Sequence, residues 1–313
     1  MRSPIPVLDA HGHLRLHVGF PYKTEPEQML EVMDALNIEA LAVTASLACW
    51  NDAPSGNIEV DEVLRRHGNR FRGYITVNPH VPDEALRELE RWSHFHNPPL
   101  IKLHPSAHQC AVNSPKYDAI WDYANQTGAV VLVHTWESHA MCSPLMFPAI
   151  AKAHPRANIL LGHSGVTWRG HEQAQEAAAA APNLYLELSG SQRNRTMVEC
   201  CVNRLGAERI IYGSDMPALD PAATLADVFT ANISDDDREK ILRYNFLRLL
   251  GESWVESASY WRDDNLQMEG THHGRGSNRH YRHGQDGTTR YARFHGKPLD
   301  AGRRVQRAPP GGG

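Results

Sequence analysis

Two histidines separated by a single glycine lie near the start of the chain, in the segment 9–13 (Asp-Ala-His-Gly-His), directly after the apolar run 5–8. Side chains at positions i and i+2 of a strand project from the same face, so His11 and His13 are expected to point the same way. Two converging imidazoles suit a divalent metal ion such as zinc, which takes nitrogen ligands at roughly 2.0–2.1 Å. In a chain with 19 histidines this pair is weak by itself, and its meaning depends on the partners that later segments supply.

Later segments carry residues of the same chemical kind at the ends of apolar runs. Lys102 and His104 occur in Ile-Lys-Leu-His-Pro, again at positions i and i+2. His134, His163 and Asp215 each follow an apolar run as a single polar group. One such histidine is ordinarily a core residue with a backbone partner. Independent segments that all end in metal-ligand residue types instead predict one shared site.

The elements that must position these residues follow an alternating pattern of strands and helices. Strands are predicted at 5–9, 39–45, 71–77, 100–103, 129–134, 158–162, 184–188 and 209–212. Helices are predicted at 25–36, 58–67, 82–92, 115–127, 144–154, 170–181, 195–205, 221–231 and 235–250. Several strands are continuous apolar runs, which is typical of a parallel sheet covered on both faces.

Eight such units predict an α/β protein with a (β/α)8 TIM barrel, whose active site lies at the carboxyl ends of the strands. An open doubly wound sheet is the alternative. That fold favours a glycine-rich phosphate-binding turn after the first strand, where this chain has His-Gly-His.

Composition and charge exclude several classes of function. The 32 Lys and Arg against 36 Asp and Glu give no electrostatic footprint for nucleic acid or a membrane surface. No apolar run approaches the ~20 residues of a membrane span, and the start of the chain leaves no room for a signal peptide. The five cysteines form no metal or disulfide pattern, so we expect a cytoplasmic protein. We expect a barrel over 1–253 and a disordered, low-complexity His/Arg/Gly-rich tail over 254–313.

The motifs together resemble the metal-dependent amidohydrolase superfamily. They are His11-Gly-His13, Lys102-Leu-His104-Pro, His134, Gly-His163-Ser-Gly and Gly-Ser-Asp215-Met-Pro. More closely, they resemble its "amidohydrolase 2" branch, which includes aminocarboxymuconate-semialdehyde decarboxylase and related hydrolases. The resemblance runs from about Val7 to Gly251 and includes a chain ending similar to the family's Asn-x-x-Arg-Leu-Phe-Gly.

The resemblance implies roles for these residues by motif position. The implied ligands of the metal ion are His11, His13, His134 and Asp215. His163 matches a histidine that contacts water or substrate in one-metal members and the second ion in two-metal members. Lys102 and His104 stay open: a carboxylated Lys102 would bridge two ions, whereas an unmodified one would hold a substrate carboxylate. We expect one divalent ion rather than two, zinc ahead of manganese.

Further residues near the strand ends have two interpretations each. Asp9 either orients a ligand imidazole or caps the strand end. Arg15 either clamps a substrate carboxylate or is solvated. Trp136 and Trp168 either cover an apolar or aromatic substrate or pack in loops. Glu187, near the end of a strand, is interpreted as a structural polar contact.

This arrangement predicts an enzyme that acts on a small molecule. Three neutral histidines and a carboxylate leave a position open on the metal ion, where a bound water has its pKa lowered to about 7. The main expectation is a metal-dependent hydrolase of an amide, lactone or ester, with Asp215 as the base and His163 assisting. The first alternative is a nonoxidative decarboxylase or hydratase of an unsaturated or aromatic acid. The second is a catalytically inactive binding barrel. The resemblance also implies a homodimer.

Overall fold

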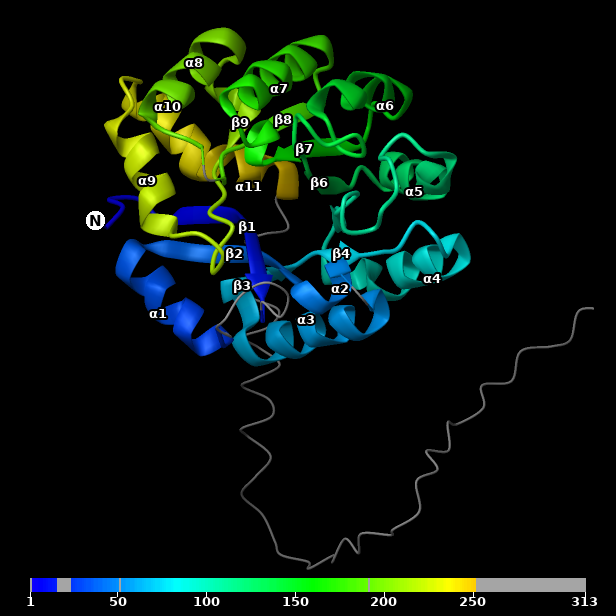
Figure 1. The fold of residues 1–313 in the computed structure, drawn as a ribbon. Helices are drawn as coiled ribbons and strands as arrows, with labels where there is room; N and C mark the ends of the chain where they lie inside the picture. The colour runs from blue at the N-terminus through cyan, green and yellow to red at the C-terminus, as the bar shows by residue number, and fades with distance from the viewer. Residues whose placement is uncertain (1, 16–23, 51, 191, 252–313) are drawn as a thin grey trace, which may run out of the picture. The chain divides into compact units, whose positions relative to one another are not determined.

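The computed structural model describes residues 2–15, 24–50, 52–190 and 192–251, in which parallel strands alternate with helices (Figure 1). The strands are β1 (Val7–Leu14), β2 (Ile38–Ala45), β3 (Phe71–Gly73), β4 (Ile75–Thr76), β5 (Leu100–Leu103), β6 (Val130–His134), β7 (Asn158–Gly162), β8 (Leu184–Glu187) and β9 (Ile210–Ile211). The helices are α1 (Pro26–Leu36), α2 (Ser46–Trp50), α3 (Ala53–His67), α4 (Pro82–Trp92), α5 (Asp118–Thr127), α6 (Phe147–Ala153), α7 (Trp168–Ala180), α8 (Arg195–Leu205), α9 (Pro221–Thr230), α10 (Asp235–Glu239) and α11 (Asn245–Leu250).

The strands form two parallel runs, β1-β2-β3 and β4-β5-β6-β7-β8-β9, which join into one closed barrel. Tyr74 separates β3 from β4, and its N–H donates to the carbonyl of Val43 at 2.8 Å, so β3 and β4 occupy one barrel position. At the other join, the N–H of Asp215 donates to the carbonyl of His11 at 2.8 Å, and a parallel bridge links β1 to the segment after β9. The predicted TIM barrel is confirmed.

Strand alternation divides the buried side chains into two layers. On β6, Val131 and Val133 pack in the layer between the sheet and the helices, whereas Val130 and Leu132 face the barrel interior. His134 is the next residue on the interior face. The interior is therefore apolar towards the amino ends of the strands and polar at their carboxyl ends, where TIM barrels carry their active sites.

The last predicted helix, 235–250, is interrupted. A π-helical turn at Lys240–Tyr244 separates α10 from α11. Phe246 and Leu249 of α11 pack into the interior apolar layer. The side-chain amide of Asn245 donates to the carbonyls of Ala207 at 2.7 Å and Ile210 at 2.8 Å, which ties α11 to the start of β9.

We expect Asn245→Ala to lower the free energy of unfolding by about 1–3 kcal/mol, because two buried carbonyls lose their donor. Chemical denaturation monitored by circular dichroism measures the change. The matched control is Asn232→Ala, at an exposed position, which should stay within about 0.5 kcal/mol. Equal losses in the two variants would contradict this role for Asn245.

Two further predictions concern membrane-spanning segments and the tail. Among the described residues, the helices are each too short or too polar to cross a membrane. The predicted tail, 254–313, lies outside the described residues.

Candidate metal centre and cavity

A bulge in β1 turns both histidines of the His-Gly-His motif into the barrel. Leu8 and Ala10 belong to the interior layer, so simple alternation would put His11 and His13 on the outside. Between Asp9 and Gly12 the register with β2 shifts by one residue, however, which reverses the alternation. A Cβ placed on Gly12 would meet the outward-facing side chain of Leu41 at 2.8 Å, so position 12 faces out and its two neighbours face in.

The carboxylate of Asp215 meets both histidines. Its Oδ1 lies 3.1 Å from Nε2 of His13 and 3.4 Å from Nε2 of His11. The donor atoms of these three residues lie within 4.8 Å of one another, the spacing of atoms that can share one cation. Asp215 follows β9 in a left-handed conformation with φ +61°, and its backbone N–H bonds to β1. Neighbouring strands therefore hold the three side chains together.

Glu187, at the end of β8, determines which ring nitrogen of His11 carries the proton. Its Oε2 lies 3.0 Å from Nδ1 of His11, and both side chains are fully buried. A carboxylate only accepts hydrogen bonds, so Nδ1 carries the proton and Nε2 presents its lone pair towards Asp215. Burial alone would raise the pKa of Glu187, but its interactions with His11 and His163 lower that pKa to about 2. A carboxylate that orients a ligand imidazole in this way is common in metal sites.

Ser189 extends the same network to His163. The Ser189 hydroxyl donates to Oε2 of Glu187 at 2.8 Å, so its oxygen accepts from Nδ1 of His163 at 2.9 Å. Nε2 of His163 is then an acceptor. Burial lowers the pKa of His163 to about 4, which keeps the ring neutral. His11, His163 and Glu187 also lie close enough to share an ion, but Nδ1 of His11 already donates to Glu187 and Nδ1 of His163 to Ser189.

Lys102 reaches the centre from β5. Its Nζ lies 2.7 Å from Nε2 of His11, and the side chain is buried. Burial lowers the pKa of Lys102. The ammonium donates to the same lone pair that a metal ion would use, so this hydrogen bond and a metal ion on His11 exclude each other. If a metal ion takes the place of the Lys102 hydrogen bond on Nε2 of His11, the nitrogen and oxygen donors of His11, His13 and Asp215 fit a divalent ion.

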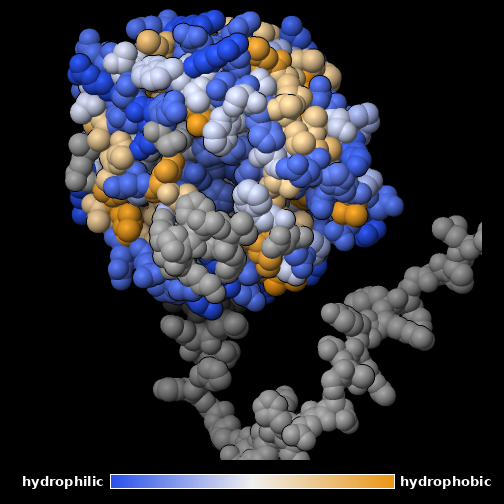
Figure 2. Space-filling model, viewed as in Figure 1, coloured by the Kyte–Doolittle hydropathy of each residue, from blue (hydrophilic) through white to orange (hydrophobic). Residues whose placement is uncertain are grey.

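The centre opens into a cavity of about 160 Å³. The ring of His134 stacks on that of His104 at 4.2 Å and meets that of His163 edge-on at 4.8 Å. His134 therefore lies at the cavity beside the close group of His11, His13 and Asp215. The surface in this view is hollowed and hydrophilic near its centre (Figure 2). The residues that line the cavity are His13, Ser46, Trp50, Lys102, His104, His134, His163, Asp215 and Ala218.

The predicted substrate residues lie elsewhere. The guanidinium of Arg15 forms ion pairs with Glu25 at 3.5 Å and with Glu59 at 3.7 Å. Trp136 is 41% exposed with its ring 6.4 Å from that of His134, and Trp168, at the start of α7, is 51% exposed. These three residues do not line the 160 Å³ cavity.

The structure decides between the two interpretations of Asp9, an imidazole partner or a cap of the strand end, and changes that of Glu187. Asp9 accepts the backbone N–H groups of His11 at 3.1 Å and Ser214 at 2.9 Å, so it joins β1 to the segment after β9 instead of orienting an imidazole. Burial raises the pKa of Asp9 to about 7. Glu187 does orient an imidazole. In the sequence, the signal for this role of Glu187 is a charged residue directly after the apolar run 184–186, with Ser189 two positions later on the same face.

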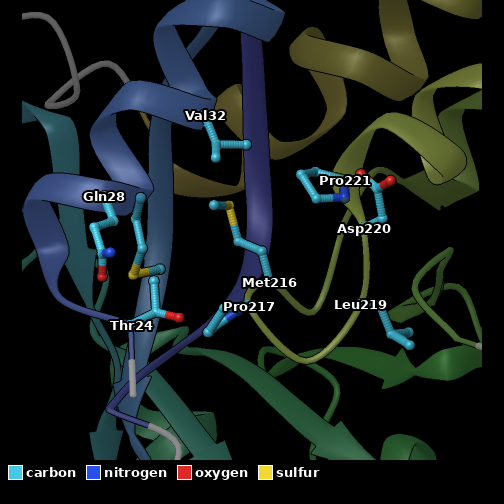
Figure 3. A pocket seen from close by; sticks show the side chains of 9 residues that line it. Thr24, Gln28, Val32, Met216, Pro217, Leu219, Asp220 and Pro221 are labelled. Carbon is cyan, nitrogen blue, oxygen red and sulfur yellow. The ribbon is translucent and has the colours of Figure 1, made fainter. Parts of the chain in front are cut away.

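A larger hollow of about 410 Å³ lies outside this site. It is mostly apolar and lies between α1 and the segment after β9, with Gln28 and Val32 on one side and Leu219 on the other (Figure 3). Met216 and Pro217 line it, directly after Asp215. It holds none of the clustered histidines, so the smaller cavity is the candidate site.

A family model described as Amidohydrolase matches residues 9–251. Gamma-resorcylate decarboxylase from Rhizobium radiobacter is 30% identical over 280 residues, covering 70% of this chain and 85% of that protein. The protein of the same name from Rhodococcus jostii is 24% identical over 280 residues, covering 69% and 84%.

Solved structures with the same fold include 2,6-dihydroxybenzoate decarboxylase from Rhizobium. It has a TM-score of 0.64 and 18% identity, and the match covers 80% of this chain and 99% of that one. Dihydroxybenzoic acid decarboxylase from a Polaromonas species, solved with manganese and the inhibitor 2-nitroresorcinol, has a TM-score of 0.64 and 17% identity, covering 82% and 99%.

Proposed function

The chain belongs to the amidohydrolase 2 branch of the metal-dependent amidohydrolase superfamily, and from this premise we propose that it is a metal-dependent, nonoxidative decarboxylase of a hydroxybenzoic acid. Two curated relatives that match most of the chain are named gamma-resorcylate decarboxylase. The observation that carries the proposal is Asp215, held against His11 and His13 at the edge of a small cavity that also contains Lys102.

The expectation of a hydrolase from the sequence is wrong. It is overturned by the relatives, which are decarboxylases and support the first alternative. The physical reason is that histidines and an aspartate around one cation serve both reactions, since both need a polarised substrate oxygen and a group that moves a proton. The strand-end residues do not encode which substrate bond breaks.

The size of the cavity supports a substrate with one ring. About 160 Å³ is close to the ~150 Å³ of an engineered cavity that binds benzene. Among the residues lining it, Lys102 carries a formal positive charge and Asp215 a negative one. A planar acid with its carboxylate near Lys102 matches this charge pattern.

His11, His13 and Asp215 would hold the metal ion, and the family resemblance adds His134 from the cavity wall. When bound, the ion acts as a Lewis acid that draws electron density from the substrate oxygens. Nitrogen and oxygen donors accept several divalent ions, and solved relatives contain manganese, so manganese is the first ion to test.

The remaining chemistry belongs to the side chains. Asp215 takes up one proton from solvent in each turnover and delivers it to the ring carbon that bears the carboxylate. The bond from that carbon to the carboxylate then breaks, its electron pair restores the aromatic ring, and carbon dioxide leaves. Lys102 offsets the carboxylate charge before the bond breaks, and Nε2 of His163 accepts a hydrogen bond from the phenolic hydroxyl.

The test is turnover of 2,6-dihydroxybenzoate by manganese-loaded protein in deuterated water. We expect carbon dioxide, and resorcinol with one deuterium at the carbon that carried the carboxylate. A chelator should abolish the reaction and added manganese should restore it. The control acid is 3,5-dihydroxybenzoate, which lacks a hydroxyl next to the carboxylate. Turnover indifferent to chelators would refute the proposal, and binding without turnover of any acid would favour an inactive barrel.

A further inference from the structure

His104 occupies a fixed place in the wall of the cavity. It follows β5 and lies two residues after Lys102, on the same interior face of the barrel. Its side chain is almost fully buried. The ring stacks nearly parallel on that of His134, at 4.2 Å and 11°, and the ring of Trp50 lies 5.2 Å away. These aromatic neighbours hold the plane of the imidazole.

Hydrogen bonds from the following turn determine which nitrogen of His104 carries the proton. The backbone N–H of Ala107 donates to Nδ1 at 3.3 Å, and the Ser106 hydroxyl lies 3.2 Å from the same atom. A backbone N–H can only donate, so Nδ1 has no proton. The proton of the neutral ring is therefore on Nε2. Within the described part of the chain, this N–H has no hydrogen-bond partner.

The polar groups of the cavity then divide into donors and acceptors. The ammonium of Lys102 and Nε2–H of His104 both donate, and they come from the same strand end. Nε2 of His163 accepts, as the Ser189 network requires. A carboxylate only accepts hydrogen bonds, so it fits the end of the cavity with Lys102 and His104, whereas a hydroxyl proton fits His163.

We propose that His104 is a specificity-determining residue that donates its Nε2–H to a carboxylate oxygen of the substrate. This inference rests on the proposed function and deepens it, because it assigns the acid end of the substrate to the β5 side of the cavity. The ring acts through direct contact with the substrate, and the backbone N–H of Ala107 sets its donor.

The first test separates the acid from the hydroxyl. Metal-loaded wild type, His104→Phe and His104→Gln are titrated with 4-fluorobenzoate and with 4-fluorophenol, and binding is followed by fluorine NMR. Phenylalanine keeps a flat ring for stacking but has no donor. We expect it to weaken fluorobenzoate binding about ten- to one-hundredfold and to leave fluorophenol nearly unchanged. Glutamine, which keeps an N–H donor, should recover part of the loss.

Two control variants should leave the binding of both probes unchanged. His139→Phe makes the same substitution outside the cavity lining and should change neither affinity. Ser106→Ala leaves the N–H of Ala107 in place and should also change neither. Equal weakening of both probes by His104→Phe, or no weakening of fluorobenzoate, would overturn the proposal. Because these probes do not need to react, a failed decarboxylation assay with the expected probe affinities would remove the proposed reaction and keep the acid-binding end.

The second test reads the proton directly. In protein labelled with nitrogen-15 at histidine, the resonances lost in both His104→Phe and His104→Gln belong to His104. Proton–nitrogen correlation spectra distinguish protonated from unprotonated ring nitrogens. We expect a protonated Nε2 and an unprotonated Nδ1. The opposite tautomer would overturn the inference whatever the binding data show.

Discussion

Replacing Asp215 by asparagine is expected to lower turnover by a factor on the order of 10³ or more while the fold persists. The variant keeps the size of the side chain but removes its charge and its transferable proton. Its Oδ1 faces His13 at 3.1 Å and His11 at 3.4 Å, so the change removes both the proton carrier and one donor of the metal cluster. Asparagine tolerates the left-handed backbone at this position better than most residues, so strain should not confuse the result.

Steady-state kinetics with a saturating divalent ion measure this effect, and thermal unfolding checks the fold. The matched control is Asp220→Asn, in the same segment after β9, where the exposed carboxylate caps α9 by accepting the N–H of Ala222 at 2.9 Å. That variant should keep wild-type turnover. Retention of more than about a tenth of the turnover by Asp215→Asn would contradict a proton-carrying role, because general acid catalysis contributes at least about a hundredfold.

The order of strands and helices could be predicted because local patterns report it directly. Apolar runs located each strand of the barrel, and Gly128 ends α5 as expected, with φ +70°. The alternation on β6 also explains why His134 belongs to the interior polar end. These features depend on neighbours in sequence, which is what periodicity measures.

The arrangement of side chains within the site could not be predicted from local sequence patterns. The bulge in β1 depends on pairing with β2, and alternation within β1 alone would have turned His11 outward. The tautomers of His11 and His163 depend on Glu187 and Ser189, from a strand far away in sequence. From the sequence Arg15 was either a clamp for a substrate carboxylate or a solvated side chain, and only the structure shows that two carboxylates lie beside it. Tertiary contacts of this kind leave no local periodicity.

Glu187→Gln is expected to weaken both the fold and the metal centre. Oε2 of Glu187 accepts from Nδ1 of His11, the N–H of His163 and the hydroxyl of Ser189, at 2.8–3.0 Å, while Oε1 accepts the N–H of Ser189 at 2.7 Å. An amide has one oxygen, so either orientation of the glutamine puts a donor against a donor. There is little room to relax, because a Cβ placed on Gly213 would lie 2.0 Å from Oε1.

The loss should be about 3–5 kcal/mol of unfolding free energy, the usual cost of breaking a buried charged network, and about ten- to one-hundredfold in divalent-ion affinity. Denaturant unfolding and calorimetric titration with manganese measure the two effects. Ser189→Ala, which removes one hydroxyl and keeps the carboxylate, should fold and show a smaller loss of affinity. The exposed Glu172→Gln should show neither effect. If Glu187→Gln and Ser189→Ala both bound manganese as tightly as wild type, Glu187 would not be the group that aims His11 at the ion, and the network would serve the fold alone.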